Sequence, residues 1–137
     1  MRYLLDTSAL LAHYRQESGW EQVQALFEQE DVTLYLCVLS LPEFGRRLYD
    51  LGASPDDVSE ALLAYCALFD ELLPIDEQVV HKALEISRAA PARLPLIDAL
   101  IAASAALRQA CLVHRDRHLS AVPGTLLTGL DLSTDHP

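Results

Sequence analysis

The 137-residue chain is predicted to fold as a three-layer α/β/α sandwich around a central parallel sheet. Short apolar and β-branched segments alternate with longer segments of helical periodicity, which is the order typical of parallel sheets. Hydrophobic residues make up 51% of the chain and charged residues 22%, as in ordinary globular domains. No Gly- or Ser-rich linker divides the chain, and its length suits one core. We therefore expect a single domain over residues 1–137.

The first half of the chain begins with a short apolar strand and then alternates between predicted helices and strands. Val32–Leu39 is apolar and β-branched along its length, which predicts a strand buried on both faces. Gly52 is expected to end the helix that follows it. In order, the predicted strand, two helices, strand and helix are Tyr3–Leu5, Ser8–Tyr14, Trp20–Gln29, Val32–Leu39 and Leu41–Leu51.

The second half of the chain continues the alternation with clear helix starts. Ser54 is a predicted N-cap with Pro55 at the first helical position, and Asp76 is a second predicted cap. The tail after Gly124 follows no pattern that identifies its structure. In order, the predicted helix, strand, helix, helix, strand and further candidate strand are Pro55–Glu71, Leu72–Ile75, Glu77–Ala90, Ile97–Gln109, Cys111–His114 and Thr125–Leu127.

The net charge of −10 is unevenly distributed. Residues 17–31 and 50–77 hold 13 of the 20 acidic residues and no lysine or arginine. The rest of the chain carries a net charge of +3. A face that is neutral or basic therefore remains available, and the composition does not exclude a nucleic-acid partner.

No segment of the sequence predicts a membrane location. The longest apolar runs, Ala61–Phe69 and Ala99–Ala103, fall far short of the roughly 20 residues that a spanning helix needs. Asp6 interrupts the first apolar run, so no signal peptide is expected. Three cysteines without metal-binding spacing suit the reduced thiols of a cytoplasmic protein: Cys37, Cys66 and Cys111.

Four acidic residues stand where parallel strands end or helices begin. Asp6 follows the first strand, and Asp116 follows Cys111–His114, so both belong at the same edge of the sheet. Glu43 and Asp98 lie in the first turns of helices, whose N-termini can face that edge. We therefore expect these four carboxylates to converge.

Each acid taken alone has a structural explanation. Asp6 can cap a helix, and Asp116 can belong to a turn. Asp98 gains from the helix dipole. Ser40 and Glu43 have the spacing of a capping box, although Glu43 can also pair with an arginine three or four residues further on.

Taken together, the acids predict a metal site. Asp6 and Asp98 are embedded in apolar sequence, and desolvated carboxylates are costly unless they are paired. Two carboxylates about 4 Å apart repel by about 4 kcal/mol at an effective dielectric constant of 20. A divalent cation removes that cost, and oxygen ligands favour Mg²⁺ or Mn²⁺ over zinc. The pattern indicates metal-assisted phosphoryl transfer.

Four segments that contain these acids resemble, in order, the four motifs of the PIN-domain ribonucleases. Their order and spacing are similar to those of single-domain VapC-type toxins, and the resemblance covers residues 1–124. A motif match of this kind is a hypothesis until its structural context is known. The four segments are Leu4–Ala12, Leu39–Phe44, Leu96–Ala105 and Leu112–Leu119.

The resemblance implies a Mg²⁺- or Mn²⁺-dependent endoribonuclease that cleaves RNA and is held inactive by a cognate antitoxin. It implies that Asp6, Glu43, Asp98 and Asp116 form the catalytic acidic cluster. Of these, Asp6, Asp98 and Asp116 would be the metal ligands. Thr7 or Ser8 would assist in the metal shell or position a phosphate. A housekeeping RNA-processing nuclease of the same family remains the alternative.

Two features depart from the family pattern. His114 stands where the family often has threonine or serine, and the tail after Gly124 matches nothing recognised. Neither departure removes a carboxylate, so we expect a competent enzyme. His114 and His118 flank Asp116 across a strand-to-loop junction, and a zinc role is not expected for them.

Six of the ten basic residues lie within five positions of a proposed site acid. Arg93, Arg115 and Arg117 are candidates for binding RNA phosphates, which position a substrate without specifying its sequence. Local ion pairing is the alternative for these arginines and for Arg46 and Arg47, which also lie near a site acid, and the structural role is favoured for Arg46 and Arg47.

Other enzyme families that place an acid after the first strand fit less well. A haloacid-dehalogenase-like phosphatase needs a second aspartate at position 8, which is Ser8, and a receiver domain needs a late lysine, whereas Lys82 is the only one. A dinucleotide-binding module needs glycines after the first strand, and none precedes Gly19. A non-catalytic interaction module remains open, because the Ala61–Phe69 segment is apolar almost all round and predicts a homodimer contact.

Overall fold

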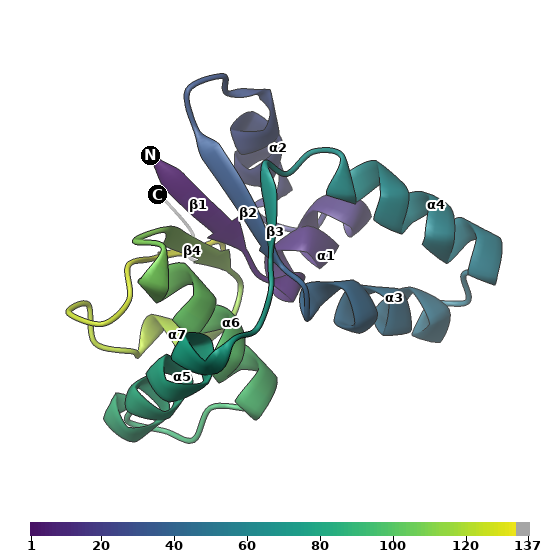
Figure 1. The fold of residues 1–137 in the computed structure, drawn as a ribbon. Coiled ribbons are helices and arrows are strands. Elements are labelled where there is room, and N and C mark those ends of the chain that lie inside the picture. The colour runs from purple at the N-terminus through teal and green to yellow at the C-terminus, as the bar shows by residue number, and fades with distance from the viewer. Residues whose placement is uncertain (134–137) are drawn as a thin grey trace.

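The structure, a computed structural model, describes residues 1–133 and contains one five-stranded sheet. All paired strands run parallel, in the order β3-β2-β1-β4-β5. Helices cover both faces of the sheet, so the predicted three-layer architecture is confirmed (Figure 1). The strands are β1 (Arg2–Leu5), β2 (Thr33–Cys37), β3 (Glu71–Leu73), β4 (Cys111–His114) and β5 (Gly129–Asp131).

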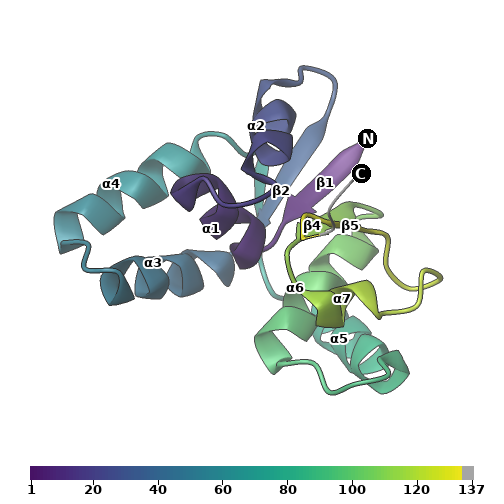
Figure 2. The same cartoon turned by 180° about the vertical axis from the view of Figure 1, so that it is seen from behind.

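Seven helices connect or follow these strands within residues 1–133. Helices α3 and α4 lie side by side and extend away from the sheet in both ribbon views (Figures 1 and 2). The helices are α1 (Thr7–Arg15), α2 (Trp20–Glu28), α3 (Ser40–Asp50), α4 (Pro55–Cys66), α5 (Glu77–Ala89), α6 (Leu96–Leu107) and α7 (Arg117–Ser120).

Alternation along the buried strands supplies both halves of the core. Successive side chains of a strand point to opposite faces of the sheet. Leu4 packs with residues of α5 and α6, whereas Leu5 packs with residues of α1 and α2. Leu36 belongs to a third cluster, which joins β2 to α1, α3 and α4. Because β1 and β2 are buried on both faces, most of their residues are apolar. This composition is what allows both strands to be predicted from the sequence.

The predicted boundaries differ from the structure by at most two residues for most elements, but the Pro55–Glu71 helix is shorter than expected. Helix α4 ends at Cys66 because the chain must turn towards the sheet. The Asp70 carboxylate accepts a hydrogen bond from the Leu34 N–H at 2.7 Å, and the Asp70 N–H donates to the Leu34 carbonyl at 2.8 Å. These bonds to β2 require an extended chain at Asp70.

The prediction of a strand at Thr125–Leu127 is wrong, because the fifth strand lies at Gly129–Asp131. The N–H groups of Leu126 and Leu127 instead donate to the carbonyl of Pro123, which forms a turn. The later strand needs Gly129, where an added Cβ would lie 3.3 Å from Nε2 of His114. Residues Gly129–Asp131 thus complete the sheet next to β4, and the last four residues of the tail lie outside the described residues.

Two simpler observations bear on the sequence expectations. No helix within residues 1–133 is both long and apolar enough to span a membrane. The three cysteines are free in the structure, and of these Cys37 is buried whereas Cys66 and Cys111 are partly exposed.

Candidate active site

The four acids predicted to converge do so at the carboxyl ends of the central strands. Asp6 directly follows β1, and Asp116 lies two residues beyond β4. The first turns of α3 and α6 bring Glu43 and Asp98 to the same edge. All four side chains line one cavity of about 530 Å³. Four sequence segments therefore contribute to one acidic site.

Asp6 is the most buried of these acids, with 4% of its surface exposed. It also caps α1, since its Oδ1 accepts hydrogen bonds from the Ala9 N–H at 3.0 Å and the Ser8 hydroxyl at 2.6 Å. Burial raises the pKa of Asp6 to about 7, to which the charges of Asp98 and Asp116 add, while the two hydrogen bonds act in the opposite direction. The capping explanation is thus correct, and the same residue lines the acidic cavity.

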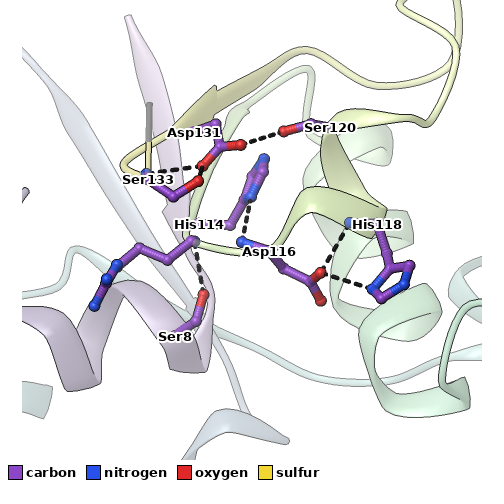
Figure 3. A network of polar contacts seen from close by, with 8 residues as sticks. Ser8, His114, Asp116, His118, Ser120, Asp131 and Ser133 are labelled. Carbon is purple, nitrogen blue, oxygen red and sulfur yellow. Dashed lines mark hydrogen bonds and ion pairs between the residues drawn. The ribbon is translucent and has the colours of Figure 1, made fainter. Parts of the chain in front are cut away.

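Ser8 fastens the β1–α1 junction to the segment that carries Asp116. Its hydroxyl donates to Asp6 and accepts the N–H of Arg115 at 2.9 Å (Figure 3). The main chain next to Asp116 is therefore held directly against the main chain next to Asp6. One shared hydroxyl thus helps to fix the relative position of these two carboxylates.

Glu43 is held by Thr7, and it does not form a capping box. The Thr7 hydroxyl donates to Oε1 of Glu43 at 2.6 Å and lies 3.2 Å from the hydroxyl of Ser40. Ser40 is the first residue of α3, whose N-cap is Leu39 and has no side-chain cap bond. Within residues 1–133 the expected reciprocal bonds of a capping box are absent, because Glu43 is turned towards Thr7 at the start of α1.

Asp98 and Asp116 form the more exposed side of the cluster. Burial raises the pKa of Asp98 to about 6, and the charges of Asp116 and then Glu43 add to the effect. Asp116 caps α7, and its Oδ1 accepts the His118 N–H at 2.9 Å and lies 3.1 Å from His118 Nδ1 (Figure 3). Mutual repulsion of these carboxylates makes the cavity a favourable place for a cation.

The ring of His114 accepts a hydrogen bond from the backbone of Asp116. Its ring is 1% exposed, and its Nδ1 accepts the Asp116 N–H at 3.1 Å (Figure 3). Burial lowers the pKa of His114, and in the neutral ring this hydrogen bond leaves the proton on Nε2. The residue at which the chain departs from the family pattern thus holds the backbone of a site acid.

The three arginines proposed as substrate ligands occupy different environments. Arg115 extends towards Glu17, with Nη1 3.5 Å from a carboxylate oxygen, and its buried Nε has no hydrogen-bond partner within residues 1–133. Arg93 and Arg117 are exposed. None of these three side chains lines the acidic cavity.

Arg46 and Arg47, which the sequence indicated as structural, line this cavity instead. The expected ion pair with Glu43 does not form, because Glu43 accepts the hydroxyl of Thr7. In the part of the chain that the structure describes, neither guanidinium has an ion pair or a hydrogen bond. Their spacing from Glu43 was a signal that sequence reasoning could have used, since residues three and four positions apart share a helix face.

The donor set of the cavity fits a hard divalent cation. Within residues 1–133 no group of three or more histidine, cysteine or acidic side chains is arranged closely enough to hold one ion. Mg²⁺ does not require such a cage, because it commonly binds one or two carboxylates and keeps waters and substrate phosphate as its other ligands. The charge of Asp116 raises the pKa of Asp98, and the carboxylate oxygens of both residues suit Mg²⁺ or Mn²⁺.

An acidic cavity at the carboxyl edge of a parallel sheet, with oxygen donors only, is typical of proteins that carry out metal-assisted phosphoryl transfer. The PIN domain model matches residues 3–124, and the chain belongs to this family, whose members are generally nucleases. Comparison with curated proteins gives no match.

Solved structures similar to this chain are toxin–antitoxin complexes. VapBC-1 from nontypeable Haemophilus influenzae is 17% identical with a TM-score of 0.75, over 98% of this chain and 100% of that chain. FitAcB from Neisseria gonorrhoeae is 23% identical with a TM-score of 0.74, over 97% and 99% of the two chains. VapBC2 from Rickettsia felis, bound to a promoter DNA fragment, is 15% identical with a TM-score of 0.75, over 96% and 98%. At these identities the likeness establishes the fold.

The raised pKa of Asp98 predicts a pH effect on the stability of metal-free protein. The folded state retains the Asp98 proton up to about pH 6, whereas its ordinary pKa is 3.8. Between these values the folded state binds more protons, so the free energy of unfolding falls as the pH rises. Asp98→Asn removes the titrating carboxyl group, so its free energy of unfolding does not fall with pH in this way. Its stability relative to wild type should increase from pH 4 to about pH 6.5 and then level off, as measured by urea unfolding in EDTA.

Asp50→Asn, at an exposed position at the end of α3, is the matched control and should show a flat difference over the same range. A flat difference for Asp98→Asn as well would contradict the desolvated environment of that carboxylate.

Proposed function

We propose that this chain is a Mg²⁺- or Mn²⁺-dependent endoribonuclease that acts as the toxin of a toxin–antitoxin pair. The observation that carries the proposal is the convergence of Asp6, Glu43, Asp98 and Asp116 on one cavity in a PIN-domain chain. Bringing partly buried carboxylates together lowers the stability of the folded state, so stability does not explain this arrangement. The arrangement is best explained by binding of a cation and a phosphodiester.

In this proposal Asp6, Asp98 and Asp116 hold the cation together, in part through the waters that Mg²⁺ keeps as ligands. A bound divalent cation supplies positive charge that activates water and stabilises the attacked phosphate. The Thr7 hydroxyl fixes Glu43 through its Oε1, which leaves Oε2 to orient a water towards the phosphorus. Ser8 keeps Asp6 and the Asp116 segment in register, and so preserves the spacing of the ligands.

An antitoxin partner is proposed from the similar structures, which include VapBC-1 and FitAcB. An acidic, partly desolvated cavity open at the sheet edge is accessible to a partner segment with a basic side chain. A housekeeping RNA-processing nuclease would share the site and lack such a partner.

A second copy of this chain is proposed to bind at the C-terminal end of α4 and at the residues that follow it as far as Leu68. The structure exposes 75% of Leu63 and 45% of Leu68, and Ala64 beside them is also exposed. This apolar surface suits a homodimer contact, as the Ala61–Phe69 segment predicted.

Catalysis is expected to require the carboxylate charges. Asp6→Asn and Asp98→Asn should each lower cleavage of total cellular RNA by at least about 100-fold, since each 1.4 kcal/mol of lost transition-state stabilisation is a factor of about ten. The fold should survive, because asparagine caps a helix about as well as aspartate. Glu43→Gln should be milder if Glu43 acts through water. The measurement uses purified protein free of any partner, with Mg²⁺ or Mn²⁺.

Glu60→Gln, at an exposed position of α4, removes a charge outside the cavity and should cleave as wild type does. Cleavage by Asp98→Asn at the wild-type rate would show that the nuclease role assigned to that residue is wrong.

Metal binding is expected to stabilise the folded state. At a free Mn²⁺ concentration 100 times Kd, the gain is about 2.7 kcal/mol, which raises the melting temperature by several degrees relative to EDTA. Asp98→Asn should lose much of this increase, and Glu60→Gln should retain it. Superimposed melting curves of wild type in Mn²⁺ and EDTA would count against a metal site.

Self-association is expected to depend on α4. The double variant Ala64→Glu with Leu68→Glu should lower the mass measured by light scattering to that of a monomer, because it places charge in an apolar contact. The matched control is Val80→Glu with Leu84→Glu, which makes the same change at exposed apolar positions of α5. A monomer produced by the α5 pair alone would place the contact elsewhere.

A further inference from the structure

A second cavity extends the acidic cavity along α3. It measures about 480 Å³ and lies between α3 and α4, where Val58 and Leu62 form part of its wall. Pro42 and Arg46 line both cavities. The two cavities therefore adjoin at these residues, and together they are here called the α3 groove, which extends from the carboxylates to the surface between α3 and α4.

Free positive charge stands at the junction of the two cavities. Arg46 and Arg47 are exposed, and within residues 1–133 neither has an ion pair or a hydrogen bond. The chain carries a net charge of −10, so partners for two arginines are plentiful. Glu43, one turn before them, is already bound to Thr7. Guanidinium groups left unpaired beside an acidic cavity are available to phosphate.

An exposed aromatic ring lines the far part of the groove. Tyr49 is 51% exposed and lies three residues beyond Arg46, so both occupy the same side of α3. The distance along the helix axis from Glu43 to Tyr49 is about 9 Å at 1.5 Å per residue. Arginine and an accessible aromatic ring are the two elements with which proteins bind single strands, through phosphate contacts and base stacking.

We propose that the α3 groove binds the single-stranded RNA segment next to the scissile phosphate, with Arg46 on a phosphate and Tyr49 stacked on a base. Arg47 adds positive charge on the wall of the acidic cavity. The proposal rests on the nuclease function proposed above and names the part of the substrate that the enzyme contacts. Charge complementarity favours RNA over an apolar protein segment, since an apolar segment would leave both guanidinium groups unpaired.

The test compares single variants in cleavage of a fluorescent single-stranded RNA with Mn²⁺. Arg46→Gln should raise KM about tenfold with kcat largely retained, because a phosphate contact is lost equally from the ground state and the transition state. It should also lower the slope of log KM against log salt by about 0.7, the value for one phosphate contact on a single strand. Tyr49→Ala should raise KM about tenfold, whereas Tyr49→Phe should resemble wild type because the ring still stacks.

Arg88→Gln is the matched control, since Arg88 is an exposed arginine on α5 that lines neither cavity. It changes the net charge equally and should leave KM and the salt slope as in wild type. Melting temperatures and light scattering accompany each variant.

The outcomes separate this inference from the proposed function. If wild type cleaves RNA and Arg46→Gln and Tyr49→Ala keep its KM and salt slope, the α3 groove is not the RNA path, although the nuclease assignment stands. If light scattering shows that these variants have a lower mass than wild type while their KM is unchanged, the groove is a protein contact and the inference is overturned. If wild type cleaves no RNA, both proposals fail.

Discussion

The gathering of carboxylates in a partly desolvated cavity is the constraint on which the rest of the site depends. Asp6 is almost fully buried, and its pKa is raised to about 7 because burial and the nearby acids disfavour its charge. A buried carboxylate of this kind destabilises a fold unless it is paired. Here it is kept in place because the same carboxylate caps α1 and accepts the hydroxyl of Ser8. The structural role of Asp6 and its proposed chemical role use the same position, so neither excludes the other.

Hydrogen bonds between distant segments hold the other acids against Asp6. Thr7 binds Glu43 of α3, and Ser8 binds the main chain of Arg115 beyond β4. Asp116 is held in addition by His114, whose ring needs the space beside Gly129 of β5. The tail of the chain therefore contributes to the site indirectly, since β5 forms the surface against which His114 packs.

The electrostatics of the chain are organised regionally. Most acidic residues lie in two segments, while the cavity combines buried carboxylates with two unpaired arginines on its rim. A phosphodiester that enters such a site needs positive charge on both sides. A bound cation would supply it within the carboxylate cluster, and Arg46 and Arg47 supply it along α3. This division of charge links the proposed catalytic site to the proposed RNA path.

The sequence by itself determined the architecture and the identity of the acidic cluster. Alternating strands and helices predict a parallel sheet, and the carboxyl ends of parallel strands share one edge, so residues that follow them must meet. Tertiary structure alone decided which hydrogen bonds hold the site together. Thr7 and Glu43 are 36 residues apart, and Ser8 and Arg115 are 107 apart, so local spacing carries no trace of these bonds. The position of β5 was decided in the same way, because it depends on pairing with β4 and on the close approach of Gly129 to the His114 ring.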